Sequence, residues 1–454
     1  MLNKSNRLWI TLSQIGGVIV LLPFVFLCVN LLVPSNENWA TLSQYWLKQY
    51  ITNTLILVTG VGLVVAALGS GLAFLMSYFQ FPLKKVFEFL LVLPLAIPAY
   101  ISAYTYSEML SYTGVVQKTL RNVFDLKLPA TYFDIMSLPG AVFIFAMALF
   151  PYVYLMVRSF LLRQDAGLME SARLLGKNVF TAYLTVIMPM TLPVMVASAT
   201  LACLEVLSDY GVTSHFGIHT FSTGIFQAWF GMHDVFTAIK VAFCGMLIAS
   251  SLIVINRVFT NTKKVQSQSS GKPIQPMPLH GASLWLAMGV LGVVALLSSI
   301  IPIAQMLVWA VQTLMHQNEL QGLWENTQNT VMVAFLAAVA VIVFALVVCN
   351  VARYFSAFWT KMPMWVGGFG YSFPSPVLAI GVLGLLISVD KWLHSIQWVN
   401  NPLLLTSSLF TLVFAYVIKY AAVGINGIDS GFVRVGMRYS EASRTLGRGM
   451  TTTF

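Results

Sequence analysis

Long apolar runs alternate with short polar segments along almost the whole chain. A helix that crosses a membrane needs about 20 mostly apolar residues. Pro94 and Pro98 interrupt the third run, but neighbouring helices can satisfy the carbonyl groups that a proline leaves without a partner. The pattern therefore predicts ten spans, near residues 10–33, 52–78, 86–108, 138–161, 186–208, 236–258, 283–312, 327–354, 363–389 and 402–428.

Three short sequence features occur twice and in the same order. The pair Asn53-Thr54 opens the second predicted span, and Asn329-Thr330 opens the eighth. The proline-containing stretch 93–106 is similar to 373–386, and ESARLLG at 170–176 is similar to EASRTLG at 441–447. Duplicated halves are a common plan for transporters. The sequence thus predicts two tandem repeats, one over 1–259 with about six spans and one over 282–454 with about four, joined by a polar cytoplasmic linker at 260–281.

Composition places the chain in lipid. Hydrophobic residues make up 58% of the sequence and charged residues only 9%, whereas a soluble domain carries about 25% charged residues. We therefore expect an all-α, polytopic transmembrane helical bundle in the lipid bilayer. The net charge of +10 could indicate nucleic-acid binding. The basic residues lie between the apolar runs and form no continuous stripe, so we expect no nucleic-acid partner.

The basic residues also predict the orientation. If the N-terminus is cytoplasmic, the outer segments hold Lys48, Lys118, Arg121, Lys127, Lys240 and Lys391. All others of the 25 basic residues, Lys419 among them, then fall on the cytoplasmic side. Because cytoplasmic loops are enriched in Lys and Arg, this orientation is the predicted one.

Residues 170–193 (ESARLLGKNVFTAYLTVIMPMTLP) lie in a predicted cytoplasmic segment. The residues from Glu170 to Leu175 favour a helix, and Gly176 permits a turn. A second amphipathic stretch comes next, and Pro189 and Pro193 mark the entry into the next span. The segment predicts a short helix-turn-helix at the membrane surface, which could dock into a groove on a cytoplasmic partner.

This segment resembles the EAA loop of ABC-importer permeases, which contains the coupling helix that inserts into the ATPase subunit. The second copy begins at 441. The resemblance assigns a coupling role to Glu170, Ser171, Ala172, Gly176, Tyr183, Glu441, Ala442 and Gly447. Ser171 and Ser443 stand where the family usually has alanine, which is an exchange between small residues. The alternative is that both segments are amphipathic interfacial helices that only stabilise the bundle.

The second copy of the loop reaches Phe454, which corresponds to Tyr183 in the first copy. In the first half, two more predicted spans lie beyond that point. We therefore expect the second repeat to be truncated, as in a fragment or a frameshifted product.

Two fused halves resemble the permeases for ferric iron and for thiamine. The segment 204–234 is similar to the loop after the EAA element in ferric-iron permeases, so iron is the preferred substrate and thiamine the alternative. Carboxylate, phenolate and imidazole groups suit a hard ferric ion. The segment offers Glu205, Asp209 and Tyr210 as candidates for the substrate path, and further donors in His215, His219, His233 and Asp234. These groups could equally be loop residues at the interface or contacts to an extracytoplasmic binding protein.

The chain has no Gly-x-x-x-x-Gly-Lys-Ser/Thr sequence of the kind that binds nucleotide phosphates. The resemblance therefore implies a separate cytoplasmic ABC ATPase, as a dimer, and an extracytoplasmic substrate-binding protein, in a bacterial inner membrane. We expect no cofactor. An ion-coupled secondary transporter is the alternative from another class, but it needs ionisable residues within the membrane. A membrane enzyme would need clustered donors at one depth.

Overall fold

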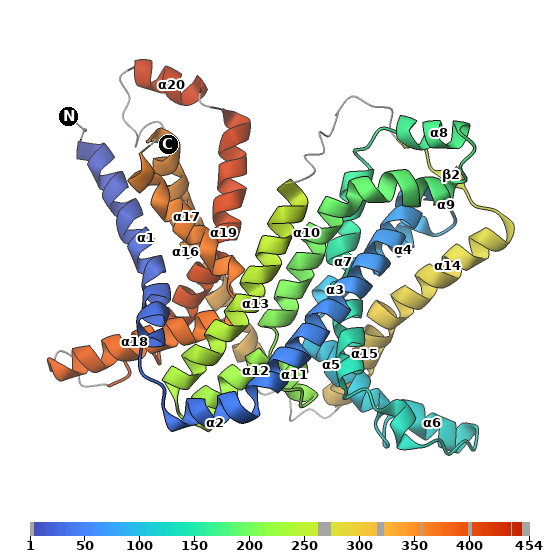
Figure 1. Ribbon diagram of the computed structural model, residues 1–454, viewed down its shortest axis with the longest axis horizontal. Coiled ribbons are helices and arrows are strands. Elements are labelled where there is room, and N and C mark those ends of the chain that lie inside the picture. The colour runs from blue at the N-terminus through green and yellow to red at the C-terminus, as the bar shows by residue number, and fades with distance from the viewer. Residues whose placement is uncertain are drawn as a thin grey trace. The chain divides into compact units, whose positions relative to one another are not determined.

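The computed structural model describes residues 4–261, 274–315, 322–355, 357–397, 402–436 and 438–446. Over these residues the regular structure is helical, except for the two-residue strands β1 (Phe79–Gln80) and β2 (Met277–Pro278), which pair in parallel (Figure 1). The predicted all-α class is confirmed. Wide π-helical turns (η3, η4 and η5) continue some of the α-helices, and η1 and η2 are short 3₁₀ turns.

The elements of the first two thirds of the chain are α1 (Lys4–Leu31), α2 (Glu37–Tyr45), α3 (Leu47–Tyr78), α4 (Lys84–Leu90), η1 (Leu93–Ala96), α5 (Ala99–Leu110), α6 (Val115–Val123), η2 (Ala130–Phe133), α7 (Leu138–Leu161), α8 (Gly167–Leu174), α9 (Val179–Ala182), η3 (Tyr183–Ile187), α10 (Met188–Ser208), α11 (Gly211–His215), α12 (Phe221–Phe226), η4 (Gln227–Gly231) and α13 (Val235–Asn261). The remaining elements are α14 (Gly281–Ala295), η5 (Leu296–Ile300), α15 (Ile301–Met315), α16 (Leu323–Tyr354), α17 (Phe358–Ser372), α18 (Ser375–Ser395), α19 (Leu409–Val435) and α20 (Arg438–Thr445).

Among the described residues, nine helices are long and apolar enough to cross a membrane. A tenth candidate, Lys84–Ala96 with Ala99–Val123, is bent by 97°. The third predicted span, at 86–108, is thus interrupted where Pro94 and Pro98 occur, and the backbone is extended at Ile97 and Pro98. The predicted span 363–389 is broken in the same way between α17 and α18. Proline lacks the N–H that a helix needs and moves the residue before it out of the helical region.

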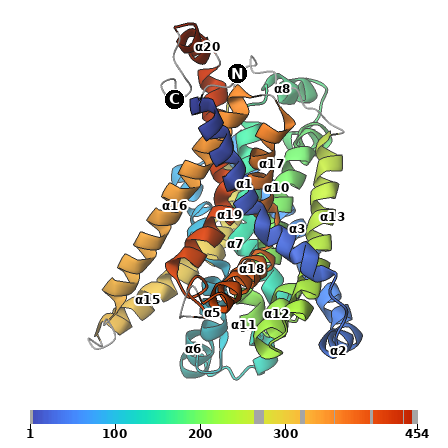
Figure 2. The ribbon, with the colours of Figure 1, turned by 90° about the vertical axis from the view of Figure 1, so that its left-hand side faces the viewer.

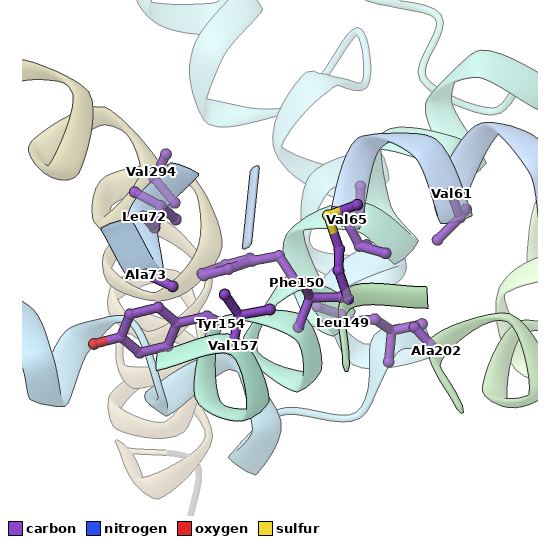
Figure 3. Close-up of a cluster of buried hydrophobic side chains, with 14 of the residues drawn as sticks. Val61, Val65, Leu72, Ala73, Leu149, Phe150, Tyr154, Val157, Ala202 and Val294 are labelled. Atoms are coloured by element: carbon purple, nitrogen blue, oxygen red, sulfur yellow. The ribbon is translucent and has the colours of Figure 1, made fainter. Parts of the chain in front are cut away.

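The first of two compact units comprises residues 42–224 and 247–319. In this unit α3, α7 and α10 pack closely together. Helix α14 packs against α4, η5 packs against η1, and α15 packs against α5. Figure 3 shows part of the core, where Val65 of α3, Leu149 of α7 and Ala202 of α10 gather in one cluster. Burial of such apolar side chains, together with close helix contacts, holds the bundle together.

The second unit comprises residues 1–41, 225–246 and 320–454. Helix α1 packs against α16, α17 and α18, and α19 packs against α16 and α17 (Figure 2). Glycines make these approaches possible, since a Cβ at Gly17 would lie 2.8 Å from Pro363 and one at Gly384 would lie 2.4 Å from Phe26.

The two compact units cross the predicted repeat boundaries. Helix α1 belongs by sequence to the predicted repeat 1–259, but it packs with the helices of 282–454, and α14 and α15 do the reverse. The first helix of each predicted repeat is thus exchanged. The repeats themselves remain a prediction from the sequence. Residues 262–273 of the predicted linker lie outside the described residues, and the part after them contains β2.

Helix bounds agree between the predicted repeats. Helices α3 and α16 both have 32 residues, and each is followed by an extended phenylalanine. Helices α5 and α18 both begin after a proline with nearly the same backbone angles, φ −54°, ψ 137° at Pro98 and φ −55°, ψ 138° at Pro374. These equivalences all lie 276 residues apart, as do Asn53 and Asn329. Later in the repeats the spacing is 271, which relates the starts of α7 and α19 and both ends of α8 and α20.

This correspondence shifts one of the alignments made from sequence. The comparison of 93–106 with 373–386 matched Leu93 to Phe373, whereas the helix breaks match Pro98 to Pro374. The broken helix is therefore the shared feature, and the four-residue difference arises because the sequence comparison matched Pro94 of η1, instead of Pro98, to Pro374.

Candidate coupling loop and substrate pocket

The first predicted coupling segment forms α8, a turn, and α9 (Figure 1). The Gly176 N–H donates to the Arg173 carbonyl at 2.9 Å, and the Lys177 N–H donates to the Ala172 carbonyl at 3.2 Å. This pair of bonds is the Schellman ending of a helix, which needs a residue with positive φ. Gly176 has φ +83°, so the turn depends on a glycine at this position. Asn178 then starts α9 by accepting the Thr181 N–H at 2.7 Å.

Helix α8 has one buried and one exposed side. Met169 and Ala172 are buried, whereas Glu170 and Ser171 are exposed. Leu174 and Leu175, at the end of the helix, are 89% and 83% exposed. These two neighbouring side chains give the end of α8 an open apolar surface. The amphipathic pattern of the sequence predicts an apolar face here, but it does not distinguish these two leucines from the buried residues.

Tyr183 anchors the coupling segment to α3. Its ring stacks on Phe74, with ring centroids 4.0 Å apart, and its hydroxyl donates to the Ser70 carbonyl at 3.3 Å. The side chain is only 4% exposed. Tyr183 therefore holds the segment in place and is not part of its exposed surface.

The strand β2 lies beside this segment in the first unit. It pairs with β1 at the end of α3, and the Leu279 N–H donates to the Gln80 carbonyl at 3.0 Å. The Arg173 guanidinium on α8 contacts the Met277 sulfur at 3.1 Å. The segment that precedes α14 therefore braces α8.

The second copy has the same local structure as far as it is described. Helix α20 has eight residues, as α8 has, and the Leu446 N–H donates to the Ala442 carbonyl at 3.2 Å. Leu175 makes the equivalent bond to Ser171 in the first copy. Leu446 is 80% exposed, close to the value for Leu175. Glu441 and Ala442 are exposed, and Gly447 lies outside the described residues.

Two of the three predicted substrate-path residues line one pocket. Glu205 and Asp209 lie one helical turn apart at the end of α10, which places both carboxylates on the same face. They share a pocket of about 240 Å³ with the broken segment at Pro98 and with Tyr100 and Tyr152. Tyr210 is not part of its lining. Broken transmembrane helices often form the binding sites of transporters.

The environment of Asp209 favours its protonated form. Burial and the nearby Glu205 carboxylate raise the pKa of Asp209 to about 6, although a hydrogen bond from the Val212 N–H acts against this. That bond is 2.8 Å long and also starts α11. Burial and a neighbouring carboxylate therefore both disfavour the ionised form of Asp209.

The other predicted donors do not gather around this pocket. The His215 ring contacts the Ser107 hydroxyl at 2.8 Å, and the His219 carbonyl accepts from Asn53 at 2.9 Å. His233 and Asp234 belong to the second unit. Over the described residues, no three His, Cys, Asp or Glu side chains come close enough to hold a metal ion.

Asp234 has a structural role. Its carboxylate accepts hydrogen bonds from Asn36 at 2.5 Å, from Asn38 at 3.0 Å and from the Thr237 hydroxyl at 2.7 Å. Burial opposes the ionisation of Asp234, but these donors hold its pKa down at about 2. The carboxylate therefore fastens the chain after α1 to the start of α13.

A charged residue lies within α19. Lys419, assigned above to the cytoplasmic segments, lies well inside α19, so that assignment is wrong. Its ammonium group donates to the Phe373 carbonyl at 3.1 Å and lies 5.7 Å from the centre of the Tyr371 ring. Phe373 precedes Pro374 at the helix break, where a carbonyl group lacks its usual helical partner. The position of Lys419 within the predicted span 402–428 was the signal that could have revealed it.

The chain is similar in sequence to permeases of several transport systems. The chain is 25% identical over 448 residues to the Fe(3+)-transport system permease protein FbpB 2 of Haemophilus influenzae, which covers 97% of this chain and 81% of that protein. It is 28% identical over 184 residues to the spermidine/putrescine permease PotB of the same organism, covering 40% of this chain and 63% of that protein. It is 26% identical over 204 residues to the sulfate permease CysT of Escherichia coli, covering 41% of this chain and 69% of that protein.

The family described as "Binding-protein-dependent transport system inner membrane component" matches residues 10–264. This match covers more than half of the chain and includes the first coupling segment, the broken helix and the acidic pocket. The protein therefore belongs to this family of multi-pass transport permeases, the membrane components of ABC importers.

Proposed function

We propose that this permease moves ferric iron, delivered by an extracytoplasmic binding protein, and is driven by a separate cytoplasmic ATPase. The observation that carries the choice of substrate is the similarity to a ferric-iron permease over 97% of this chain. The polyamine and sulfate permeases are similar to it over less than half of the chain. Thiamine remains the alternative that the fused halves suggest.

In this proposal, α8 and α20 are the two coupling helices, with Glu170, Ser171 and Ala172 on the first and Glu441 and Ala442 on the second. Each helix ends in a highly exposed leucine, Leu175 or Leu446. A groove on each ATPase subunit would take up these leucines. The Gly176 turn and the Tyr183 anchor would transmit the movement of the ATPase to α3 and α10. This arrangement requires the N-terminus to be cytoplasmic.

The acidic pocket is the proposed entrance to the translocation path in the first unit. Glu205 and Asp209 place two carboxylates beside a helix break, where they would attract an incoming cation. Since the described residues form no metal-ion cluster, the two carboxylates would attract the cation only transiently. A polyamine would also be attracted by this pair, which makes an organic cation the second candidate substrate.

Reconstitution tests both parts of the proposal. The chain is placed in proteoliposomes with an ATPase subunit, and binding proteins loaded with ferric iron, with spermidine or with thiamine are added outside. We expect the ferric protein alone to stimulate ATP hydrolysis and iron uptake. Stimulation by the spermidine or thiamine protein, with the ferric one inert, would overturn the choice of substrate.

Substitutions then test the pocket separately. We expect Glu205→Gln with Asp209→Asn to reduce uptake strongly, while the ATPase still co-purifies with the chain. Asp125→Asn is the matched control, because Asp125 is an exposed carboxylate outside the pocket. Equal uptake by the double variant and the control would remove the pocket from the pathway.

A further inference from the structure

An open groove runs along the second unit between α16 and α19. It has a volume of about 730 Å³. The walls include Ala334 and Ala338 on α16 and Tyr416 and Tyr420 on α19, and Asn329 and Thr330 lie at one end. Tyr416 is 40% exposed and Tyr420 is 46% exposed. Such a wide opening between two packed helices requires an explanation.

The equivalent groove in the first unit is filled. The spacings of 276 and 271 residues relate Tyr416 and Tyr420 to Phe145 and Leu149, which are 1% and 9% exposed. Helix α10 covers them, since it packs against both α3 and α7. Its Cys203 sulfur lies 3.4 Å from the Val58 carbonyl and 2.9 Å from where a Cβ on Gly62 would be. Val58 and Gly62 correspond to Ala334 and Ala338.

The repeated Asn-Thr pair binds the loop after the covering helix. In the first unit, the Asn53 side chain donates to the His219 carbonyl at 2.9 Å, and the Thr54 hydroxyl accepts the Phe221 N–H at 3.3 Å. Both bonds are to the backbone of the loop that comes after α10 and α11. In the second unit, Asn329 and Thr330 are exposed at the end of the groove. They offer the same amide and hydroxyl groups to a backbone.

We infer that the groove between α16 and α19 is the seat of one transmembrane helix of the α10 type. That helix presents a face of small residues, as α10 does with Ser198, Ala202 and Cys203, and is followed by a loop whose backbone binds Asn329 and Thr330. Small residues let helix backbones approach closely in a membrane. A lipid chain would fill the apolar walls but would supply no backbone groups to the amide and hydroxyl at the end.

A probe peptide tests this inference in the full chain. The peptide comprises residues 177–224, so it carries α10, the loop after it and its native Cys203. The chain carries Ala338→Cys, at the position equivalent to Gly62. Both are reconstituted together at a fixed ratio in vesicles of phosphatidylethanolamine and phosphatidylglycerol, then oxidised. The peptide–chain disulfide is located by proteolysis and mass spectrometry, with the unsubstituted chain showing any reaction of the native cysteines.

The matched control is Leu336→Cys, which is exposed on α16 but lies outside the groove. We expect the disulfide to Ala338→Cys to exceed that to Leu336→Cys by about tenfold, which corresponds to a preference of about 1.4 kcal/mol. Asn329→Ala with Thr330→Ala should reduce the yield at Ala338→Cys severalfold. Equal yields at both cysteines, or none at either, would overturn the inference in favour of lipid. Chain–chain disulfides without the peptide would instead assign the groove to a second copy of the chain.

Discussion

The helix pairs α3–α7 and α16–α19 have one backbone plan and two different surfaces. Helices α3 and α16 have the same length, and each is followed by a helix that breaks at a proline. The first pair is covered by α10, while the same face of the second pair is open. Beside the first break lie the carboxylates of Glu205 and Asp209, and beside the second lies the Lys419 ammonium. The shared residues thus set the backbone, and the charged residues at the breaks distinguish the halves.

The point where the helices cross shows the same contrast at one contact. In the first unit, Gly69 on α3 faces Val153 on α7, and a Cβ at Gly69 would lie 2.6 Å from Val153. The equivalent positions in the second unit are Ala345 and Gly424, with 3.2 Å between the Ala345 Cβ and a Cβ at Gly424. The small residue has moved from one helix to the other. The crossing therefore needs one glycine, on either side.

The largest expected effect comes from removing that glycine. Gly69→Ala should destabilise the first unit by about 3 kcal/mol, because the new Cβ would also approach the backbone of Tyr154. Adding Val153→Gly copies the second unit's arrangement and should restore much of the loss. Thermal unfolding in detergent measures Gly69→Ala, Val153→Gly and the double variant. If the double variant is as unstable as the sum of its single changes, the two crossings are not equivalent.

Removing the charge beside the second break should have the next largest effect. Lys419→Met leaves the Phe373 carbonyl without this donor, and a hydrogen bond from a charged group is worth about 2 kcal/mol. We expect a lower unfolding temperature and a changed uptake rate, while the ATPase still binds. The matched control is Lys391→Met, which removes an exposed lysine near the end of α18. If Lys419→Met leaves both stability and uptake unchanged, the charge has no role at the break.

The coupling turns should show a smaller effect on stability and a clear one on coupling. Gly176→Ala places a side chain at φ +83°, which costs about 1 kcal/mol although no atom lies within 4 Å of the new Cβ. Gly71→Ala is the control, because it also has open space but no positive φ. We expect only Gly176→Ala to reduce the ATP hydrolysis that drives uptake. Equal effects of the two variants would show that the turn is not needed.

The two exposed leucines test whether both coupling helices act alike. Leu175→Ser and Leu446→Ser change side chains that are 83% and 80% exposed, so each should alter stability by less than about 0.5 kcal/mol. Each should weaken the association with the ATPase to a similar degree, as measured by co-purification. A loss with only one of them would make that helix the dominant contact.

Much of the fold could be predicted from the sequence, because a membrane span has a simple signature of about 20 apolar residues. The Gly176 turn was also predictable from local sequence, because a turn with positive φ favours glycine. The breaks at Pro98 and Pro374 were less so: proline is tolerated in some spans, and neighbouring helices decide whether the chain bends. The role of Tyr183 depends on Phe74, over a hundred residues away. Contacts between residues far apart in the chain, such as Tyr183 with Phe74 or α1 with the helices of the other repeat, produce no local pattern in the sequence.

The dependence of stability on pH has a different form in each unit. Asp209 of the first unit has a pKa raised to about 6. Its protonated form favours the folded state below the unfolded pKa of about 4, and that contribution is lost as the pH rises through about 6. Asp234 of the second unit has a pKa lowered to about 2, so its contribution is present above about pH 4 and is lost only as the pH falls toward 2. As the pH increases from about 4 to about 7, the unfolding temperature of Asp209→Asn should therefore increase relative to that of the unsubstituted chain. Over the same range, the unfolding temperature of Asp234→Asn should stay below that of the unsubstituted chain by a constant amount. Asp125→Asn serves as the control, and a constant difference for Asp209→Asn would show that its carboxylate is solvated and that the pocket is open to water.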